Sequence, residues 1–238
     1  MTAFVLVHGG FHGSWCWEPV IKPLRSAGHR VEAVDMPGRP GGPMRSCIDL
    51  ASYGEAVAAA IDRVGEPVVL AVHSAGGVAA SLAVQLRPEA ISRLVFVNAL
   101  LPNAGETALD IVARGGPDCV LLREGALLPS TDGATLSIDS PETAIDAFYN
   151  CCETSTAKEA AAKLVPEPLL PARQPLAVTA ARFGVPKTYV GSKNDHCLSW
   201  ALQQQMSEEY GARFVELDGD HSPFLSATDD LLTTLIEA

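Results

Sequence analysis

The stretch LAVHSAGGVA, residues 70–79, joins an apolar run to a His-Ser pair that two glycines follow almost at once. A buried strand gains nothing from a hydroxyl at its end, so Ser74 needs another explanation. In a nucleophile elbow, a strand turns sharply into a helix and presents a nucleophile at the tip of the turn. We therefore predict that Ser74 is a nucleophile and that the Ala75 N–H, at the positive end of the helix, faces the reacting oxygen. The alternative is a serine whose hydroxyl caps the helix.

Small residues must flank such a nucleophile, because strand and helix approach each other closely in the turn. Ala75, Gly76 and Gly77 meet this requirement on the helix side. Val72 departs from it, because it occupies the place of the first glycine in the G-x-S-x-G pattern. We expect its branched side chain to crowd or strain the turn.

The overall composition describes a globular chain with a full core. It has 238 residues, of which 47% are hydrophobic, and a net charge of −11. The negative charge argues against nucleic acid or an anionic membrane as the main partner, since both require clustered Lys and Arg. No apolar run approaches the roughly 20 residues of a membrane span, and the N-terminus lacks the pattern of a signal peptide. We therefore expect a cytoplasmic protein.

The cysteines give no sign of a metal site or a disulfide framework. None forms a CxxC pair, and no Cys/His set has zinc-finger spacing. No cysteine lies in a motif typical of a nucleophile either. We expect reduced thiols without a catalytic role at Cys16, Cys47, Cys119, Cys151, Cys152 and Cys197.

Short, continuously apolar runs alternate with helical patterns along most of the chain. Strands of this kind are typical of parallel sheets that are covered on both faces. The pattern predicts a doubly wound, mostly parallel α/β sheet of about six strands. The predicted strands are residues 3–7, 30–35, 67–72, 93–98, 187–191 and 213–218. The predicted helices between them are residues 15–27, 46–64, 75–85, 200–210 and 228–237.

About 85 residues separate the fourth strand from the fifth, which is too long for a simple crossover. Helical patterns at residues 106–114, 141–152 and 156–164 favour a helical cap or lid inserted into the sheet domain. We therefore predict a core of residues 1–100 and 185–238 and a cap of residues 101–184. Because ligands bind beyond the carboxyl ends of the strands in such sheets, the cap is placed to cover a site. Ordinary connecting loops are the alternative.

The glycine-rich stretch LVHGGFHGSWCW, residues 6–17, follows the first strand directly. In this arrangement the loop after an early strand supplies the second N–H of an oxyanion hole. We assign that N–H to Gly10, with Phe11 as the alternative. His8 and His12 precede the serine and lie in the turn itself, so we expect them to brace the loop.

The order nucleophile, acid, histidine predicts the remaining catalytic residues. Asp195 follows the predicted strand 187–191, and His221 follows the last strand. Asp218 and Asp220 compete as the acid, but Asp220 is adjacent to His221 and poorly placed to reach its ring. Asp218 ends a strand and is more typical of a loop cap.

Together these motifs resemble the α/β-hydrolase fold superfamily. The similarity is greatest to the branch of plant methyl esterases and hydroxynitrile lyases with their bacterial esterase relatives. The motifs are VLVHGGFHGSWCWEPVIKPLRSAGHRVEAVDMPG (5–38), HSAGG (73–77), GSKND (191–195) and GDHSPF (219–224). The resemblance covers residues 3–101 and 185–238. It implies a family core shortened by two N-terminal strands, a cap over an apolar pocket, a Ser-His-Asp triad, and no metal or organic cofactor.

The cyanohydrin lyases of this branch typically carry Thr after the first His of the glycine loop and Lys directly after the catalytic His. Here those positions are Gly9 and Ser222, and neither can stabilise a departing anion as an ammonium would. The sequence therefore favours ester hydrolysis. We predict a serine hydrolase for a small carboxylic ester, such as a methyl ester or a lactone.

The pocket walls and the partners are less constrained by the sequence. The position of Trp17 is better explained by core packing. The sequence is compatible with a homodimer. It also leaves two alternative functions: a lyase or cyclase that uses His221 as a base, and a ligand-binding receptor. Loop or cap position makes candidate pocket residues of His12, Trp15, Leu100, Phe148, Tyr149 and Trp200.

Overall fold

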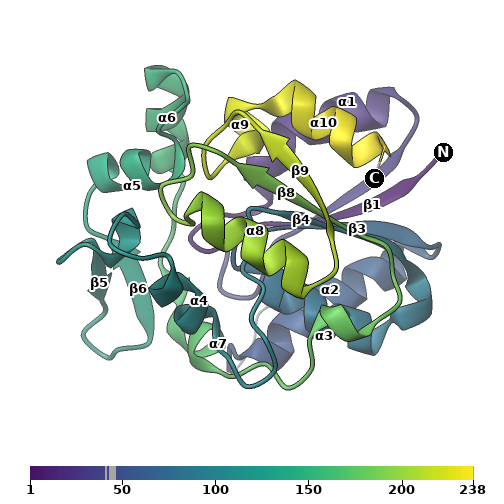
Figure 1. The fold of residues 1–238 in the computed structure, drawn as a ribbon, viewed down its shortest axis with the longest axis horizontal. Coiled ribbons are helices and arrows are strands. Elements are labelled where there is room, and N and C mark those ends of the chain that lie inside the picture. The colour runs from purple at the N-terminus through teal and green to yellow at the C-terminus, as the bar shows by residue number, and fades with distance from the viewer. Residues whose placement is uncertain (41, 43–46, 238) are drawn as a thin grey trace.

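The computed structural model describes residues 1–40, 42 and 47–237. Its centre is a six-stranded sheet, and every pair of neighbouring strands in it is parallel. The strand order is β2-β1-β3-β4-β8-β9 (Figure 1). The strands are β1 (Ala3–Val7), β2 (Arg30–Val34), β3 (Val68–His73), β4 (Ile91–Val97), β8 (Lys187–Ser192) and β9 (Arg213–Leu217). The doubly wound α/β prediction is confirmed.

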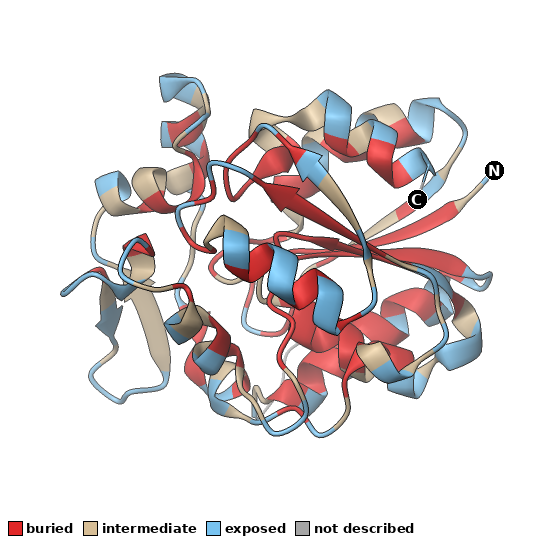
Figure 2. Ribbon diagram, viewed as in Figure 1, coloured by how far each residue is buried: buried red, intermediate tan, exposed pale blue. Residues whose placement is uncertain are grey.

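Helices cover both faces of this sheet (Figure 1). One face carries α1 (Glu18–Ser26), α9 (Pro223–Ser226) and α10 (Thr228–Glu237). The other carries α2 (Leu50–Val64), α3 (Gly76–Leu86) and α8 (Trp200–Glu209). Figure 2 shows the result: the inner strands β1, β3 and β8 are almost entirely buried, whereas the edge strand β9 and the helices also carry exposed residues. Short 3₁₀ turns lie at Ser14–Trp17, Pro88–Ala90, Val120–Leu122 and Ala180–Arg182.

Strand β3 explains why the strand sequences are apolar without interruption. Its side chains alternate between two separate hydrophobic clusters, one on each face of the sheet. Val68, Leu70 and Val72 enter the cluster formed with α2 and α3. Val69 and Ala71 enter the cluster formed with α1 and α10. Both faces of the strand are therefore buried, as the sequence pattern predicts.

The helix that precedes β3 has a well-defined start. Asp49 accepts the Ser52 N–H at 2.8 Å, and the Ser52 hydroxyl accepts the Asp49 N–H at 3.1 Å. This reciprocal cap fixes the first turn of α2 at Leu50. The predicted start of this helix at residue 46 lies outside the described residues.

The segment between β4 and β8 lies beside the carboxyl ends of the strands (Figure 1). It contains α4 (Ala108–Arg114), α5 (Pro141–Phe148), α6 (Thr154–Ala161) and α7 (Leu169–Arg173). It also contains an antiparallel three-stranded sheet of β5 (Leu127–Pro129), β6 (Thr135–Ile138) and β7 (Glu167–Pro168). The expected helices are present, but the three strands were not predicted, because strands this short leave no periodic pattern. The domain boundaries at residues 101 and 184 stay a prediction.

None of the helices in the described ranges is long and apolar enough to cross a membrane.

Candidate active site

Ser74 lies in the sharp turn between β3 and α3. Its φ of 49° is in the left-handed region, which is strained for a residue with a side chain. Three backbone hydrogen bonds hold this conformation: the Ser74 N–H donates to Val97, and the Ser74 carbonyl accepts from Gly77 and Leu100 at 2.9–3.1 Å. The α3 N-terminus has no side-chain cap, so the interpretation of Ser74 as a capping serine is wrong. The hydroxyl is directed elsewhere.

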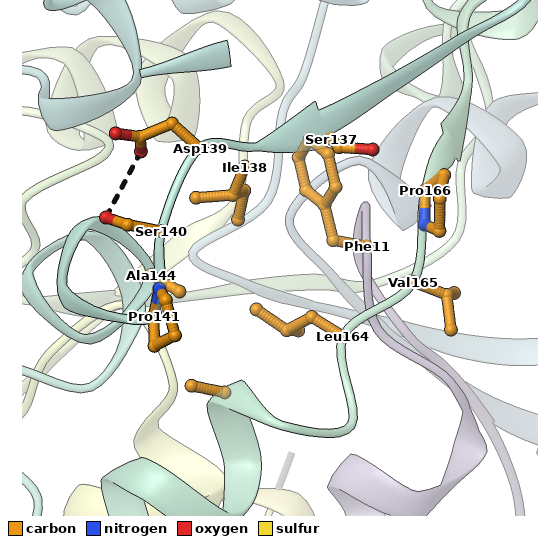
Figure 3. A pocket seen from close by; sticks show the side chains of 11 residues that line it. Phe11, Ser137, Ile138, Asp139, Ser140, Pro141, Ala144, Leu164, Val165 and Pro166 are labelled. Atoms are coloured by element: carbon orange, nitrogen blue, oxygen red, sulfur yellow. Dashed lines mark hydrogen bonds between the residues drawn. The ribbon is translucent and has the colours of Figure 1, made fainter. Parts of the chain in front are cut away.

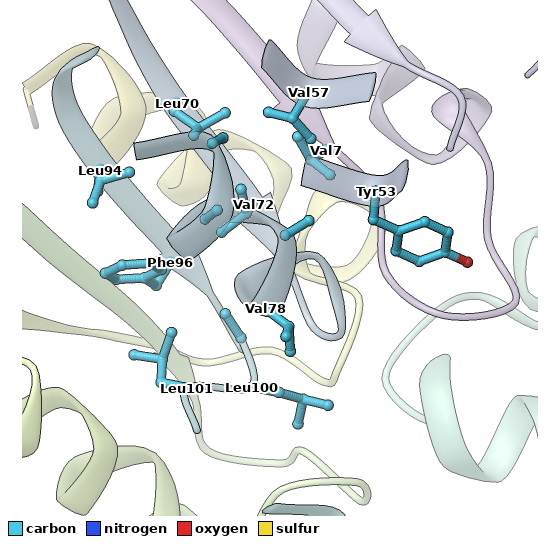
Figure 4. Packing of buried hydrophobic residues seen from close by; sticks show 14 of the residues in the cluster. Val7, Tyr53, Val57, Leu70, Val72, Val78, Leu94, Phe96, Leu100 and Leu101 are labelled. Carbon is cyan, nitrogen blue, oxygen red and sulfur yellow. The ribbon is translucent and has the colours of Figure 1, made fainter. Parts of the chain in front are cut away.

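In this turn, neighbouring backbone approaches the chain most closely at the two glycines Gly76 and Gly77. A Cβ at Gly77 would lie 2.4 Å from the Leu100 carbonyl oxygen, and one at Gly76 would lie 2.8 Å from the His8 carbonyl oxygen. The left-handed backbone conformation of the turn falls on Ser74, whereas Val72 stays within strand β3. Its side chain is completely buried in the cluster with Phe96 and other apolar residues, because the alternation of β3 directs it there (Figure 4).

A hydrogen-bonded relay links Ser74 to two residues from distant loops. The Ser74 Oγ lies 2.9 Å from His221 Nε2, and His221 Nδ1 lies 2.8 Å from Asp195 Oδ2. The second carboxylate oxygen of Asp195 accepts the N–H groups of Cys197 and Leu198 at 2.7 and 2.9 Å. The carboxylate is thus fixed in the plane that orients the imidazole. The structure brings the three residues predicted from chain order together.

The competing acids are engaged elsewhere. Asp220 Oδ1 accepts from the Ser222 N–H and the Ser226 hydroxyl, and its Oδ2 accepts the Cys151 N–H at 2.9 Å. Asp218 accepts from the exposed Asn194 amide at 3.2 Å. Neither carboxylate is hydrogen-bonded to the His221 ring, so Asp195 is the partner of the histidine.

Two polar side chains hold the His221 loop through its backbone. The His73 Nε2 donates to the His221 carbonyl at 2.8 Å, and the Asn98 amide donates to the same oxygen at 3.1 Å. Burial lowers the pKa of His73, which keeps its ring neutral beneath the turn. The sequence gives no sign of the role of Asn98, whose contact is with a residue 123 positions away.

The two candidate oxyanion donors differ in their availability. The Phe11 N–H is already bound to the Glu167 carboxylate at 2.7 Å, so Phe11 is not a free donor. The Gly10 N–H has no hydrogen-bond acceptor among the described residues. Gly10, Ala75 and Ser74 line one cavity, as a serine and its two N–H donors must. The geometry therefore favours Gly10 and Ala75.

This cavity has a volume of about 90 Å³ and mostly apolar walls. Leu100 and Phe148 line it, in agreement with the sequence prediction. Most of the other wall residues come from the inserted segment and were not predicted. Ala108 and Val112 follow helical spacing on α4 and could have been found by that signal. The remaining wall is Phe11, Leu109, Leu121, Leu127, Leu136, Glu167 and Ala172.

The other four predicted pocket residues do not line this cavity. His12 donates from Nδ1 to the Gly10 carbonyl at 2.8 Å, and its Nε2 accepts the buried Tyr149 hydroxyl at 2.8 Å. Burial lowers the pKa of His12 to about 3, so its ring is a neutral brace. Trp15 stacks on His12 at 5.5 Å, and Trp200 packs against Phe214. The prediction from loop position therefore placed more aromatic residues in the cavity wall than the structure does.

Phe11 also lines a second cavity, of about 220 Å³ (Figure 3). Phe11, Ile138 and Leu164 are among its apolar walls, and Ser137, Asp139 and Ser140 form its polar edge. Phe11 is the residue that lines both cavities.

Two residues of the relay and a neighbouring cysteine form a group whose ligand atoms are close enough together to hold a metal ion. Ligand atoms of Asp195, Cys197 and His221 lie within 4.8 Å of one another. However, burial raises the pKa of the Cys197 thiol, which donates to the Ala147 carbonyl at 3.1 Å. A protonated thiol is a poor metal ligand, so the group is better suited to the proton relay.

Comparison with known proteins agrees with this geometry. The model of the alpha/beta hydrolase family matches residues 4–234. Methyl jasmonate esterase 1 of Vitis vinifera is 31% identical over 98% of this chain and 95% of its own length. The putative chloroplastic methylesterase 11 of Arabidopsis thaliana is 28% identical over 98% of this chain, which spans 63% of that protein.

Solved structures show the same architecture. Polyneuridine aldehyde esterase superposes with a TM-score of 0.85 at 26% identity, covering 100% of this chain and 98% of that one. Tomato methylketone synthase I, complexed with 2-tridecanone, gives a TM-score of 0.85 at 25% identity over 99% and 96% of the two chains. The chain belongs to the alpha/beta hydrolase family, in the branch of the plant methylesterases. By class it is a carboxylic ester hydrolase.

Proposed function

We propose that this enzyme hydrolyses a small, neutral carboxylic ester, such as a methyl ester or a lactone, through an acyl-enzyme on Ser74. The observation that carries the proposal is the relay Ser74–His221–Asp195, with hydrogen bonds of 2.9 and 2.8 Å, next to an apolar cavity. Relatives named methyl jasmonate esterase and methylesterase support the methyl ester.

Acylation begins when the Ser74 oxygen attacks the ester carbonyl carbon and His221 Nε2 takes the hydroxyl proton. Asp195 holds the ring with Nδ1 protonated and stabilises the imidazolium that forms. The N–H groups of Gly10 and Ala75 stabilise the negative oxygen of the tetrahedral intermediate, each by about 3 kcal/mol in comparable sites. The intermediate collapses when the alcohol leaves with the proton from His221.

Deacylation repeats these steps with water. His221 takes one proton from the water as its oxygen attacks the acyl carbon, and the intermediate collapses onto the Ser74 oxygen. The carboxylic acid leaves, and Ser74 regains its proton from His221. One water is consumed for each ester cleaved.

The walls of the cavity indicate the class of substrate. Nearly all of its lining is aliphatic or aromatic, so the acyl part of the substrate is expected to be apolar. Among the described wall residues the one charged group is the Glu167 carboxylate, which is already paired with Arg39, so the wall offers no free cation to a substrate with a negative charge near the ester. A neutral ester fits both conditions.

Cleavage of a cyanohydrin is less well supported. A departing anion requires a nearby cation, and no Lys or Arg is among the described residues that line the cavity. Ser222, which follows His221, is completely buried and carries no charge. Ester hydrolysis requires no such cation.

Labelling with an organophosphonate probe, followed by mass spectrometry, tests the proposal. We expect the probe on Ser74 of the wild-type protein and no label on Ser74→Ala. Ser92→Ala is the matched control, because Ser92 lies at the amino end of β4 and its hydroxyl donates to the Val68 carbonyl. A folded wild-type protein that takes up no label would contradict the acyl-enzyme mechanism.

A further inference from the structure

Glu167 is a buried carboxylate that the proposed mechanism does not use. It lies on β7 in the inserted segment, only 8% exposed, and it lines the cavity next to Ser74. Its Oε2 accepts the Phe11 N–H at 2.7 Å and pairs with the Arg39 guanidinium. Its Oε1 accepts the Tyr53 hydroxyl at 2.9 Å. The carboxylate thus joins the insertion to the core at the glycine loop.

The peptide between Gly10 and Phe11 is held from both sides. The His12 ring donates to its carbonyl at 2.8 Å, and Glu167 accepts its N–H at 2.7 Å. The carbonyl of Phe11 itself accepts the Val165 N–H at 2.9 Å. Phe11 has a φ of 62°, a left-handed conformation that costs a residue with a side chain about 1 kcal/mol or more. These bonds stabilise a loop conformation that the chain would not adopt alone.

The charge of Glu167 is balanced within the same buried cluster. The Arg39 side chain is 1% exposed, and its Nε donates to the His12 carbonyl at 2.6 Å. The Tyr53 hydroxyl points away from the hydrophobic cluster, and its pKa is raised by burial and by the charge of Glu167 (Figure 4). Tyr53 therefore remains a donor to the carboxylate. A buried ion pair of this kind requires each partner to stay in place.

We infer that Glu167 is a positioning residue for the oxyanion hole: it clamps the Gly10–Phe11 peptide so that the Gly10 N–H faces the substrate. This inference rests on the proposed function, because the oxyanion forms only if Ser74 attacks a carbonyl. The clamp comes from the inserted segment, whereas the peptide that it holds belongs to the core. The insertion therefore takes part in catalysis through Gly10 and is more than a cover.

Glu167→Met tests the clamp with a side chain of similar length. Phe11 and Arg39 both donate to Oε2, and Tyr53 donates to Oε1. Methionine has neither oxygen, so it cannot hold the Phe11 N–H, whereas a glutamine could keep that bond through its amide oxygen. With p-nitrophenyl acetate we expect kcat to fall at least tenfold and KM to change less than threefold. Tyr53→Phe is the matched control, because it removes a hydrogen bond to the same carboxylate but leaves the bond to Phe11. We expect it to lose at most threefold.

A trifluoromethyl ketone supplies a readout that a purely structural role would not change. Its tetrahedral adduct on Ser74 carries an oxyanion, so its inhibition constant should rise by the same factor as kcat/KM falls. Should Glu167→Met not fold, Glu167→Asp keeps the charge, retracts the carboxylate from Phe11, and should show the same parallel loss.

Two outcomes overturn the inference. One is an unchanged kcat in a folded Glu167 variant, and the other is a loss of kcat without weaker binding of the ketone. Labelling of Ser74 by the phosphonate in the same preparations shows which claim has failed. If the wild type is labelled and Glu167→Met has normal activity, the clamp alone is contradicted. If the wild type is not labelled, the hydrolase mechanism is contradicted and the clamp with it.

Discussion

The loops at the carboxyl ends of the core strands and the segment inserted between β4 and β8 contribute differently to the site. In the proposed mechanism the core loops supply the relay Ser74–His221–Asp195 and the two N–H donors. The inserted segment supplies most of the apolar wall and the carboxylate that holds the Gly10–Phe11 peptide. We therefore propose that the core determines the type of reaction and that the insertion mainly determines the choice of substrate.

Removal of the core histidine should have the largest effect. We expect His221→Ala to lower kcat on a p-nitrophenyl ester by about 10⁴-fold or more, and the double variant with Ser74→Ala to be little worse. The reason is that members of a triad act as a unit. Steady-state kinetics of the four proteins measures this, and independent, multiplicative losses would contradict a shared mechanism.

Val72→Gly tests the stability of the core beside the site. Val72 is fully buried, so the substitution leaves a cavity and also makes the unfolded chain more flexible. We expect the free energy of unfolding to fall by about 3 kcal/mol. Urea unfolding of both proteins checks this, and a change below about 1 kcal/mol would show that Val72 strains the turn after all.

Low pH should reduce the free energy of unfolding, because the buried His12 in the glycine loop is neutral in the folded protein. Burial lowers the pKa of His12 from 6.5 to about 3, so below pH 6.5 the unfolded chain binds a proton that the folded protein rejects. The stability that this contributes is complete above pH 6.5 and is lost as the pH falls toward 3.

Urea unfolding at pH 7 and pH 5 measures this linkage. The part due to His12 amounts to a loss of about 2 kcal/mol between the two pH values. His12→Gln should therefore show a smaller pH dependence than the wild type, whatever its stability at pH 7. An equal pH dependence in both proteins would mean that His12 is protonated in the folded state.

A substitution in the part of the cavity wall that the insertion forms should change the selectivity between esters rather than the reaction itself. Leu136 on β6 lines the cavity, and Leu136→Trp should fill part of it. We expect kcat/KM for p-nitrophenyl hexanoate to fall about tenfold relative to that for the acetate, about 1.4 kcal/mol. Leu128→Trp is the control, because Leu128 is exposed on the neighbouring strand. Equal losses for both esters would contradict the division between the two regions.

The same division explains what the sequence could predict. The elbow at Ser74 and the Asp195 and His221 loops follow strands with clear patterns, so chain order was enough to find them. The alternation of β3 also carried the information that Val72 faces the core, although the motif comparison suggested otherwise. The candidate catalytic residues of the core could be predicted because each lies in a short, local motif.

The contribution of the insertion could not be read in this way. Glu167 stands between two prolines and meets Phe11 across 156 positions of sequence, so no local pattern marks it. The strands β5, β6 and β7 have only two to four residues each, which is too short for a periodic signal. Their positions are set by tertiary packing.

The acyl-enzyme on Ser74 is the central claim, and its formation can be measured directly. Rapid mixing of the wild-type enzyme with p-nitrophenyl acetate, quenched in acid and read by intact mass, should show an added acetyl group. Peptide mapping should place that group on Ser74, with a burst of p-nitrophenol of about one equivalent if deacylation is the slower step. The same experiment at low pH slows deacylation and favours accumulation of the acyl-enzyme. Turnover of the ester with no acyl adduct on Ser74 at any quench time, at either pH, would contradict covalent catalysis by this serine.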